Sequence, residues 1–222
     1  MSKTVAIIPA RGGSKRLPNK NLKLLGNLPL IAHSINYAKA NAGIIDDIYV
    51  TTDSDTIKNI ALEYGANVID RPKELSGDLE PTITALKHAI SILEDVETVV
   101  LLQPTNPLRP KSLMIEAFTI FKDNNFDSLF TVSRDYKKLG KIIDNKYKPF
   151  NYKIGQRSQD LQPLYFENGL LYITKSSIIK AGKIISKNSF PLEINHLYAH
   201  VDIDTSEHLK YAEYLLSKPN IK

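Results

Sequence analysis

The segment formed by residues 9–21 has the clearest capacity for phosphate chemistry in this sequence. It runs PARGGSKRLPNKN and places two adjacent glycines among several cations. Adjacent glycines adopt positive φ angles without strain and let backbone N–H groups approach phosphate oxygens closely. Arg11, Lys15 and Lys20 would neutralise a triphosphate and stabilise the charge that builds on a leaving pyrophosphate. A Gly-Gly turn with a purely structural role is the alternative, and the surrounding cations favour the phosphate site.

The positive charge of the chain is concentrated near its start. The formal net charge is +5, and no acidic residue occurs between Met1 and Ile45. Such a segment suggests a polyanionic partner, either a nucleic acid or a nucleoside triphosphate, and a solvated basic face is the alternative. The glycine spacing matches neither the GxxxxGK[ST] of a P-loop nor the GxGxxG of a dinucleotide site, which disfavours both.

Two carboxylates form the second chemical motif, in the sequence VDIDT at residues 201–205. Side chains alternate along an extended chain, so Asp202 and Asp204 would lie on one face. Two carboxylates presented together suit Mg²⁺ or Mn²⁺, which takes further ligands from water and substrate phosphates. A competing interpretation makes Asp204 the N-cap of the next helix, with Glu207 as its capping-box partner. That interpretation leaves Asp202 unexplained.

Alternating strand and helix patterns predict the framework that positions these motifs. Short apolar runs predict buried strands at residues 4–9, 47–51, 67–69, 98–102, 170–174 and near 197–201. Apolar residues at helical spacing predict helices at residues 29–40, 56–64, 82–93, 113–121, from 176, and at 206–216. This alternation indicates an α/β fold with a doubly wound, mostly parallel sheet, whose ligands bind beyond the carboxyl ends of the strands. We expect residues 1–222 to form a single domain, in which Asp53 and Asp55 are turn and cap residues.

Residues 133–166 interrupt the alternation. The segment is basic and rich in tyrosine, with turn signals at Leu139-Gly140 and Asp144-Asn145. Its hydrophobic pattern is too weak for a core of its own, and a structureless loop of ~30 residues is improbable in a compact domain. We therefore predict a hairpin-like arm that projects from the sheet and packs on another subunit.

Composition narrows the class of protein further. The 222 residues include no cysteine, which excludes disulfides, thiolate nucleophiles and zinc-thiolate sites. No segment approaches the ~20 consecutive apolar residues that cross a bilayer. We expect a soluble, cytoplasmic protein without a membrane partner.

The run AIIPARGGSKRLPNKN closely resembles the nucleotide loop of acylneuraminate cytidylyltransferases, the CMP-sialic-acid synthetases and their relatives. The resemblance continues in family order along essentially the whole chain, through VTTDSD, DRPKEL, LLQPTNPLR, QDL, ENGLLYI and VDIDT. It implies a fold of the nucleotide-diphospho-sugar transferase type. The sister family that acts on the eight-carbon sugar KDO differs at Gly12-Gly13, where it has an aromatic or small residue, so KDO ranks second.

The resemblance implies a reaction and a set of site residues. The anomeric hydroxyl of a nonulosonic, sialic-acid-like sugar acid would attack the α-phosphate of CTP, which gives the CMP-sugar and pyrophosphate. The implied catalytic residues are Arg11, Lys20, Asp202 and Asp204, with Mg²⁺ or Mn²⁺ on the two aspartates. The implied nucleotide-binding residues are Ala10, Arg11, Gly12, Gly13, Ser14, Lys15, Lys20, Asn21, Arg71 and Thr82. The implied sugar-binding residues are Gln103 and Asn168, and Lys138, Lys141 and Arg157 are this sequence's own candidates for binding the sugar carboxylate. A structural pairing of Arg71 with Glu74 is an alternative for that arginine.

The sequence departs from the family where the sugar is held. Many members carry arginines at the positions that Ser158 and Phe166 occupy here. Arg157 lies one place earlier, although a shift of one residue in extended chain changes the face. The resemblance therefore leaves several sugar acids open: N-acetylneuraminic, legionaminic and pseudaminic acids, KDN and KDO. It also implies a homodimer whose exchanged arms complete the neighbour's sugar site, while the general base stays open between metal-bound water and Asp204.

Two rival functions belong to other classes. A nucleic-acid-binding protein would use the basic start and the tyrosine-rich arm, but it has no role for Gln103 or the acidic pair. A catalytically silent nucleotide-binding subunit would bind CTP without releasing pyrophosphate. The intact charged residues of the nucleotide loop and of VDIDT argue against silence, and we expect no nucleic-acid partner.

Overall fold

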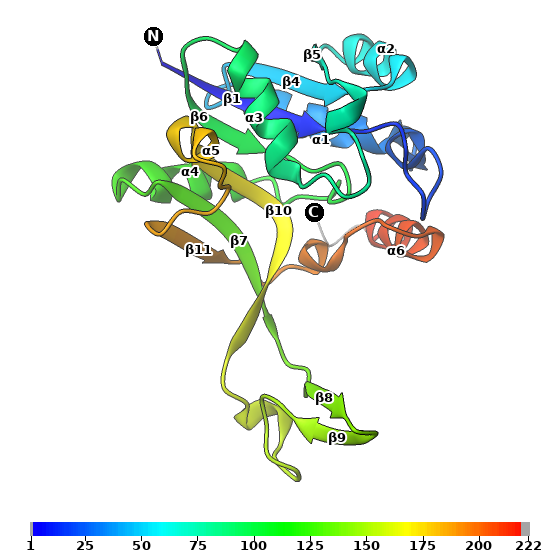
Figure 1. Cartoon of the computed structure of the whole chain (residues 1–222), viewed down its shortest axis with the longest axis vertical. Coiled ribbons are helices and arrows are strands. Elements are labelled where there is room, and N and C mark those ends of the chain that lie inside the picture. Colours follow the sequence, from blue (N-terminus) through cyan, green and yellow to red (C-terminus); the bar gives the residue numbers. More distant parts are fainter. Residues whose placement is uncertain (1, 219–222) are drawn as a thin grey trace.

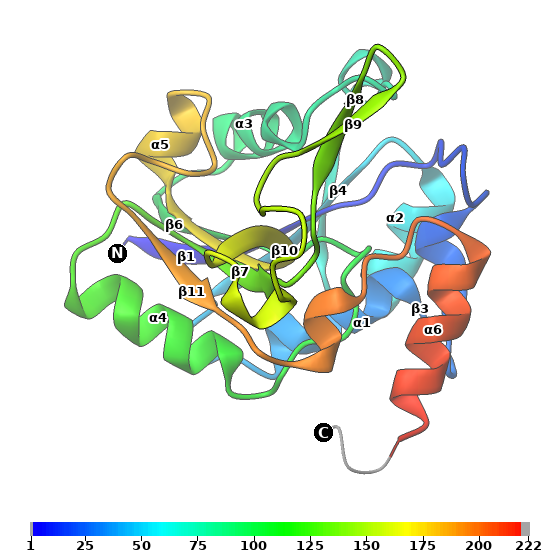
Figure 2. The same cartoon turned by 90° about the horizontal axis from the view of Figure 1, so that it is seen from below.

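The computed structural model describes residues 2–218, whose body is a seven-stranded sheet covered by helices on both faces (Figures 1 and 2). The strand order is β11-β7-β10-β6-β1-β4-β5, and only β10 runs antiparallel to its neighbours. The strands are β1 (Lys3–Pro9), β4 (Asp47–Thr52), β5 (Asn67–Asp70), β6 (Val96–Leu101), β7 (Ser128–Asp135), β10 (Leu164–Lys175) and β11 (Ser189–Glu193). This arrangement confirms the mostly parallel α/β fold.

The helices fall into two layers because side chains alternate along the buried strands. In β1, Ala6 and Ile8 face one layer, and Val5 and Ile7 face the other. The first layer holds α1 (Leu30–Lys39), α2 (Asp55–Glu63) and α4 (Leu113–Asp123), and the second holds α3 (Thr82–Ile92) and α5 (Ser176–Lys180). Figure 2 shows α3 and α5 on one side of the sheet and α1 and α4 on the other.

Shorter elements complete the framework around the carboxyl ends of the strands. The last helix, α6, spans the predicted residues 206–216 and packs against the small β2–β3 hairpin. The remaining elements are η1 (Lys20–Leu22), β2 (Leu24–Leu25), β3 (Leu28–Pro29), η2 (Lys73–Leu75), η3 (Ser158–Asp160) and η4 (Leu197–His200).

The strand predicted near residues 197–201 is wrong, because this segment forms the 3-10 helix η4. Tyr198 and Ala199 are both buried although they are adjacent, which a turn allows and a strand with one covered face does not. His196 caps the turn, since its Nδ1 accepts a hydrogen bond of 3.1 Å from the Tyr198 backbone N–H. The sheet closes instead with β11, which pairs with β7.

Beyond the sheet, β7 and β10 continue as a pair and lead to an outlying hairpin, β8 (Gly140–Ile143) with β9 (Lys146–Pro149). Figure 1 shows this arm standing away from the body. Its apolar side chains are unusually exposed: Tyr136, Ile142, Tyr147, Phe150 and Ile154 each have more than half of their surface open, and Ile154 reaches 85%.

A wide bulge interrupts β10 where it leaves the sheet. Glu167 pairs with Val132 and Tyr172 with Phe130, so five steps of β10 oppose two steps of β7. Gly169 lies inside the bulge with φ +74°, and a Cβ there would meet Asn106 Oδ1 at 2.7 Å. Glycine is therefore required at this position.

The helices are short or amphipathic. Within residues 2–218, none is long and apolar enough to cross a membrane.

Candidate functional site

A polar cavity of about 510 Å³ opens at the carboxyl ends of β1, β5 and β6. Strand ends in such sheets are the usual place for ligands. It collects most of the predicted nucleotide residues. Those that line it are Arg11, Ser14, Lys15, Lys20, Asn21, Arg71 and Thr82. Ala10, Gly12 and Gly13 belong to the same loop but are not among the lining residues.

Two cations of the loop are bound by Asp78, which no sequence motif marks as a site residue. Asp78 lies in the loop before α3 and accepts ion pairs from Arg11, at 2.9 Å, and from Lys15. The Arg11 guanidinium also donates to the Gly77 carbonyl at 2.8 Å. The hydrogen bond from Lys15 and the charges of both cations hold the pKa of Asp78 below its ordinary value.

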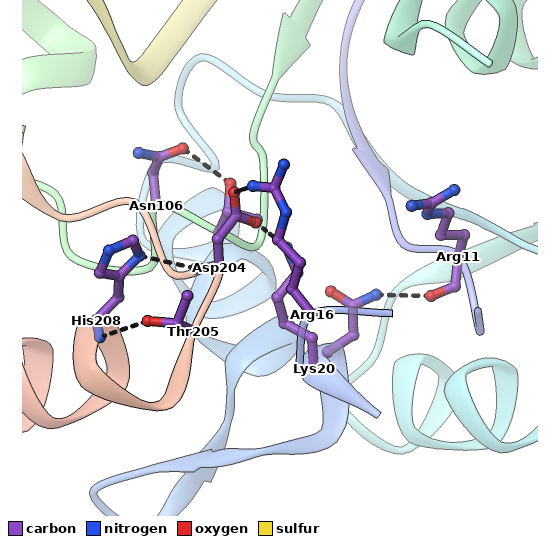
Figure 3. Close-up of polar contacts among 9 residues, drawn as sticks. Arg11, Arg16, Lys20, Asn106, Asp204, Thr205 and His208 are labelled. Atoms are coloured by element: carbon purple, nitrogen blue, oxygen red, sulfur yellow. Dashed lines mark hydrogen bonds and ion pairs between the residues drawn. The ribbon is translucent and has the colours of Figure 1, made fainter. Parts of the chain in front are cut away.

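The other two cations are bound by Asp204 (Figure 3). Lys20 Nζ lies 2.7 Å from one carboxylate oxygen and Arg16 Nη1 lies 3.1 Å from the other. Burial raises the pKa of Asp204, but the bond from Lys20 and the charges of Lys20 and Arg16 outweigh it, so the net pKa is lowered. The loop thus holds four cations, each against one of two internal carboxylates.

Asp204 is not the N-cap of α6. That role belongs to Thr205, whose side chain accepts a hydrogen bond from the His208 backbone N–H at 3.3 Å. His208 Nδ1 in turn accepts from the Asp204 backbone N–H at 3.2 Å. The Asp204 carboxylate is therefore directed at the nucleotide loop instead of the helix.

Backbone anchors fix the loop itself. The Gly12 N–H donates to Asp53 Oδ1 at 2.9 Å, and Asn21 Nδ2 donates to the Arg11 carbonyl at 2.9 Å. Neither Gly12 nor Gly13 has a positive φ, which corrects the expected reason for the glycines. A Cβ on Gly12 would lie 3.0 Å from Ser54 Cβ, so close packing against the start of α2 accounts for this glycine.

Arg71 is the least satisfied charged group of the cavity. It is only 8% exposed, and its Nε and Nη2 have no hydrogen-bond partner. Burial lowers the pKa of Arg71, and the negative charge of Asp53 partly offsets this. The alternative pairing with Glu74 does not occur among the described residues. A buried, unpaired guanidinium facing a cavity is costly unless a ligand supplies acceptors.

A second cavity, of about 420 Å³, adjoins the first and shares Gln103 and Thr105 with it. Asp202 lines the second cavity and Asp204 lines the first, and the buried Val201 and Ile203 alternate with them. The remaining lining residues of the second cavity are Asn106, Lys137, Phe166, Glu167, Asn168, Gly169, Tyr172, Ala199 and His200. The acidic pair is thus divided between the two adjoining cavities.

The side chain of Asn168 is held inside the wall of this second cavity. Its Oδ1 accepts from Thr131 Oγ1 at 2.5 Å and from the Leu170 N–H, and its Nδ2 donates to Ser133 Oγ at 3.0 Å. Asn106 Nδ2 completes the network by donating to the Asn168 carbonyl at 3.0 Å. Asn168 therefore shapes the cavity wall, and its amide is largely engaged there.

The three predicted arm residues line neither cavity of this chain. Lys138 lies over the ring of Tyr152, and Lys141 lies over Phe150. Arg157 forms an exposed ion pair with Asp160, with Nε–Oδ2 at 2.8 Å.

Sequence reasoning missed several residues that line the second cavity. Phe166 lies there instead of the expected arginine, with its ring 5.8 Å from that of His200. Lys137 is the only cation among the described lining residues. Tyr172 donates to Glu167 Oε2 at 3.1 Å, and burial, together with the charges of Glu167 and Asp202, raises the pKa of Tyr172. Only the position of Phe166, next to ENG, was visible in the sequence.

The mostly parallel sheet and the two polar cavities define a nucleotidyltransferase-like α/β protein. The profile of the cytidylyltransferase family matches residues 5–219, and the chain belongs to this family. The family membership confirms the resemblance found in the motifs.

The chain is similar to several cytidylyltransferases that are named for their sugar acids. Over 213 residues, the chain is 34% identical to N-acylneuraminate cytidylyltransferase of Streptococcus agalactiae. The matched region covers 92% of this chain and 51% of the streptococcal protein. The chain thus spans about half the length of the streptococcal relatives. It is 34% identical to pseudaminic acid cytidylyltransferase of Campylobacter jejuni over 96% of each chain. It is 35% identical to CMP-N,N'-diacetyllegionaminic acid synthase of Legionella pneumophila over 90% of each chain.

Solved structures agree on the fold. A CMP:2-keto-3-deoxy-manno-octonic acid synthetase complexed with CTP matches with a TM-score of 0.73 at 16% identity, over 97% of this chain and 99% of the other.

Proposed function

We propose that this protein transfers CMP from CTP to the anomeric hydroxyl of a nonulosonic acid and releases pyrophosphate. The observation that carries the proposal is the pair of adjoining cavities, one lined by cations and one by polar and aromatic groups. They meet at Gln103 and Thr105, and each contains one aspartate of the acidic pair. The names of the relatives, which act on N-acylneuraminic, pseudaminic and diacetyllegionaminic acids, support this class of substrate.

The first cavity would bind CTP. Phosphoryl transfer depends on positioning and on charge neutralisation more than on covalent chemistry. Arg11, Lys15 and Lys20 would exchange their internal carboxylates for triphosphate oxygens and neutralise the charge that develops on pyrophosphate. Ser14 and Arg71 would offer further donors, and Thr82 lies at the first turn of α3 beside them.

The acidic pair fits a divalent cation such as Mg²⁺ or Mn²⁺. Asp202 makes no hydrogen bond or ion pair with any described residue, so its carboxylate is available. Within residues 2–218 no cluster of three or more His, Cys, Asp or Glu side chains forms a closed metal site. A cation held by Asp202 and Asp204 would therefore take its other ligands from water and substrate phosphates. When bound, such a cation would polarise the α-phosphate and neutralise charge there.

The second cavity would bind the sugar acid. Gln103 is placed to hydrogen-bond either substrate because it lines both cavities, and Asn168 supports the wall. A homodimer with exchanged arms would bring Lys138, Lys141 and Arg157 of one subunit to the sugar of the other. The exposed apolar residues of the arm support such a dimer, because a monomer rarely leaves this many open.

The test is to incubate the protein with CTP, Mg²⁺ and a panel of sugar acids, and to measure pyrophosphate. The panel contains N-acetylneuraminic, legionaminic and pseudaminic acids, KDN and KDO. We expect turnover with at least one nonulosonic acid, and its loss when the divalent cation is chelated. Turnover with KDO alone selects the eight-carbon sugar, and CTP binding with no turnover selects the silent subunit. Binding of DNA or RNA that falls steeply with salt, without turnover, selects the nucleic-acid binder.

A further inference from the structure

Arg109 is a buried arginine that joins three separate elements. It is 6% exposed and lies in the loop between β6 and α4. Its Nε donates to the Leu170 carbonyl at 2.6 Å, its Nη2 to the Gln103 carbonyl at 2.9 Å, and its Nη1 to Ser34 Oγ at 3.2 Å. One planar guanidinium thus connects the β10 bulge, the loop that carries Gln103, and helix α1.

No carboxylate pairs with Arg109 among the described residues. Burial lowers the pKa of Arg109 to about 10, which leaves it charged at neutral pH. Besides its three hydrogen-bond acceptors, the ring of Tyr37 stabilises the charge, with its centroid 5.5 Å from the guanidinium carbon. Loss of the guanidinium would leave the Leu170 and Gln103 carbonyls without this donor, so Arg109 contributes to stability. A purely structural role accounts for these hydrogen bonds but not for the choice of elements that they join.

The position of Gln103 gives a better explanation. Its carbonyl receives the bond from Arg109 and a longer one, at 3.5 Å, from Ser34 Oγ. Its side chain lies at the boundary of the two cavities. The other carbonyl, of Leu170, follows Gly169 in the bulge that lines the second cavity. The guanidinium thus fixes Gln103 relative to the wall that faces it.

We infer that Arg109 is a positioning residue, which holds Gln103 in place for the sugar acid by tying its backbone to β10 and α1. The inference rests on the proposed function, since it assigns the sugar to Gln103. Lysine cannot replace arginine here, because a single ammonium does not reproduce the fixed fork of donors that spans three acceptors.

The test compares Arg109→Lys, Arg109→Met and Ser34→Ala with Gln103→Ala and with the double variant Gln103→Ala/Arg109→Met. Steady-state kinetics give kcat and the KM for the sugar acid, calorimetry gives the Kd for CTP, and thermal unfolding gives Tm. The control is Ser128→Ala, because buried Ser128 lines neither cavity and bonds to Ser186 N at 2.8 Å.

Both Arg109 variants are expected to raise the sugar KM about tenfold, the effect of losing one well-placed hydrogen bond, while the Kd for CTP is unchanged. Ser34→Ala should raise the sugar KM by a smaller factor. If the Arg109 variants fail to fold, Ser34→Ala provides the test instead. The double variant should have the sugar KM of Gln103→Ala alone. Ser128→Ala should lower Tm without changing the KM.

Two results overturn the inference while leaving the proposed function intact. One is an equal weakening of CTP and sugar binding in the Arg109 variants, which marks a general structural role. The other is a rise in the sugar KM on Arg109→Met that is as large in the Gln103→Ala background as in the parent protein. A parent protein that turns over no sugar acid overturns the proposed function and this inference together.

Discussion

At the scale of single residues, the cations of the nucleotide cavity are paired with carboxylates of the same chain. Asp78 and Asp204 each bind two of the four loop cations. Exposed ion pairs of this kind contribute little to stability because water and salt screen them. Their effect is expected on ligand binding instead, since a triphosphate must displace the carboxylates to reach the same cations.

Asp78→Asn is expected to strengthen CTP binding. The substitution removes the internal competitor of Arg11 and Lys15, and because the pairs are exposed the Kd for CTP should fall only about twofold to fivefold. Calorimetry at low and at high salt measures this. Asp160→Asn removes the exposed ion pair of Arg157 in the arm and is the matched control, with no expected change. Weaker CTP binding in Asp78→Asn would mean that Asp78 itself supports the nucleotide.

Arg71→Met is expected to weaken CTP binding without loss of stability. The guanidinium is buried and two of its nitrogens are unpaired, so an apolar side chain of similar length should leave Tm unchanged or higher. The Kd for CTP should rise about tenfold to a hundredfold, the effect of losing one or two charge-assisted hydrogen bonds. Thermal unfolding and calorimetry on the same samples check both parts. A lower Tm with unchanged CTP affinity would show that Arg71 is structural.

Asp204→Asn is expected to reduce stability at neutral pH and to lose that effect in acid. The pKa of folded Asp204 lies below the ordinary value of 3.8, so its carboxylate stabilises the fold above that pH. The contribution disappears as the pH falls below 3.8 through the folded pKa. Because Asp204 is partly exposed, the difference in unfolding free energy at pH 7 should not exceed about 1 kcal/mol.

Urea unfolding of parent and variant at pH 7 and near pH 3 measures this difference. Asp202→Asn is the control, because Asp202 forms no ion pair among the described residues, and its unfolding free energy should match that of the parent at both pH values. A difference for Asp204→Asn that persists unchanged in acid would contradict the ion-pair argument.

At the scale of elements, the β10 bulge shapes the second cavity. Gly169→Ala should cost about 1–3 kcal/mol, because it combines a left-handed backbone with a Cβ that contacts Asn106. Asn106 would have to move, so the sugar KM should rise as well. Gly155→Ala is the control, since Gly155 has φ +87° with nothing within 4 Å of its Cβ. It should show the backbone strain alone and no change in KM. Equal effects of the two variants would refute a special role for the bulge.

Sequence patterns predicted most of these elements because each has a local cause. Residues 206–216 were predicted as the last helix and form α6 without a change of bounds. The predicted nucleotide loop and Asp204 do come together. Both had a local signal in the sequence, because the loop follows a buried strand and Asp204 alternates with buried apolar residues. The strand near residue 197 was wrong, since short apolar segments have no clear period until their partners are known. β7 and β11 were not predicted for the same reason.

The rest of the site depends on contacts between distant segments. Asp78 is separated from Arg11 by 67 positions, and nothing in its surroundings distinguishes it from other loop aspartates. The role of Asn168 inside the wall follows from Thr131 and Ser133 on a neighbouring strand. Contacts of this kind can be seen only in the three-dimensional structure.

At the scale of the whole molecule, the arm raises the question of which subunit completes each site. Its cations lie away from both cavities of their own chain, and its apolar side chains are open. If arms are exchanged in a homodimer, Lys141 acts on the sugar of the neighbour, whereas Gln103 acts on the sugar of its own subunit. A Lys141 variant would then impair the site of the neighbouring subunit, and a Gln103 variant would impair the site of its own subunit.

Lys141→Ala and Gln103→Ala are mixed, unfolded and refolded together, and assayed at a sugar concentration so far below their raised KM that neither variant alone turns over measurably. The mixture is expected to restore activity. Each mixed dimer contains one site with both residues intact, so random pairing should recover about a quarter of the parent turnover. Gln103→Ala mixed with Arg11→Ala is the control, because both residues belong to the body of the same subunit and no mixed dimer regains a full site. Light scattering is used to check that each refolded sample is dimeric. Lack of recovery in a sample that is dimeric would show that each chain builds its sugar site alone, and equal recovery in both mixtures would show that the body residues are exchanged too.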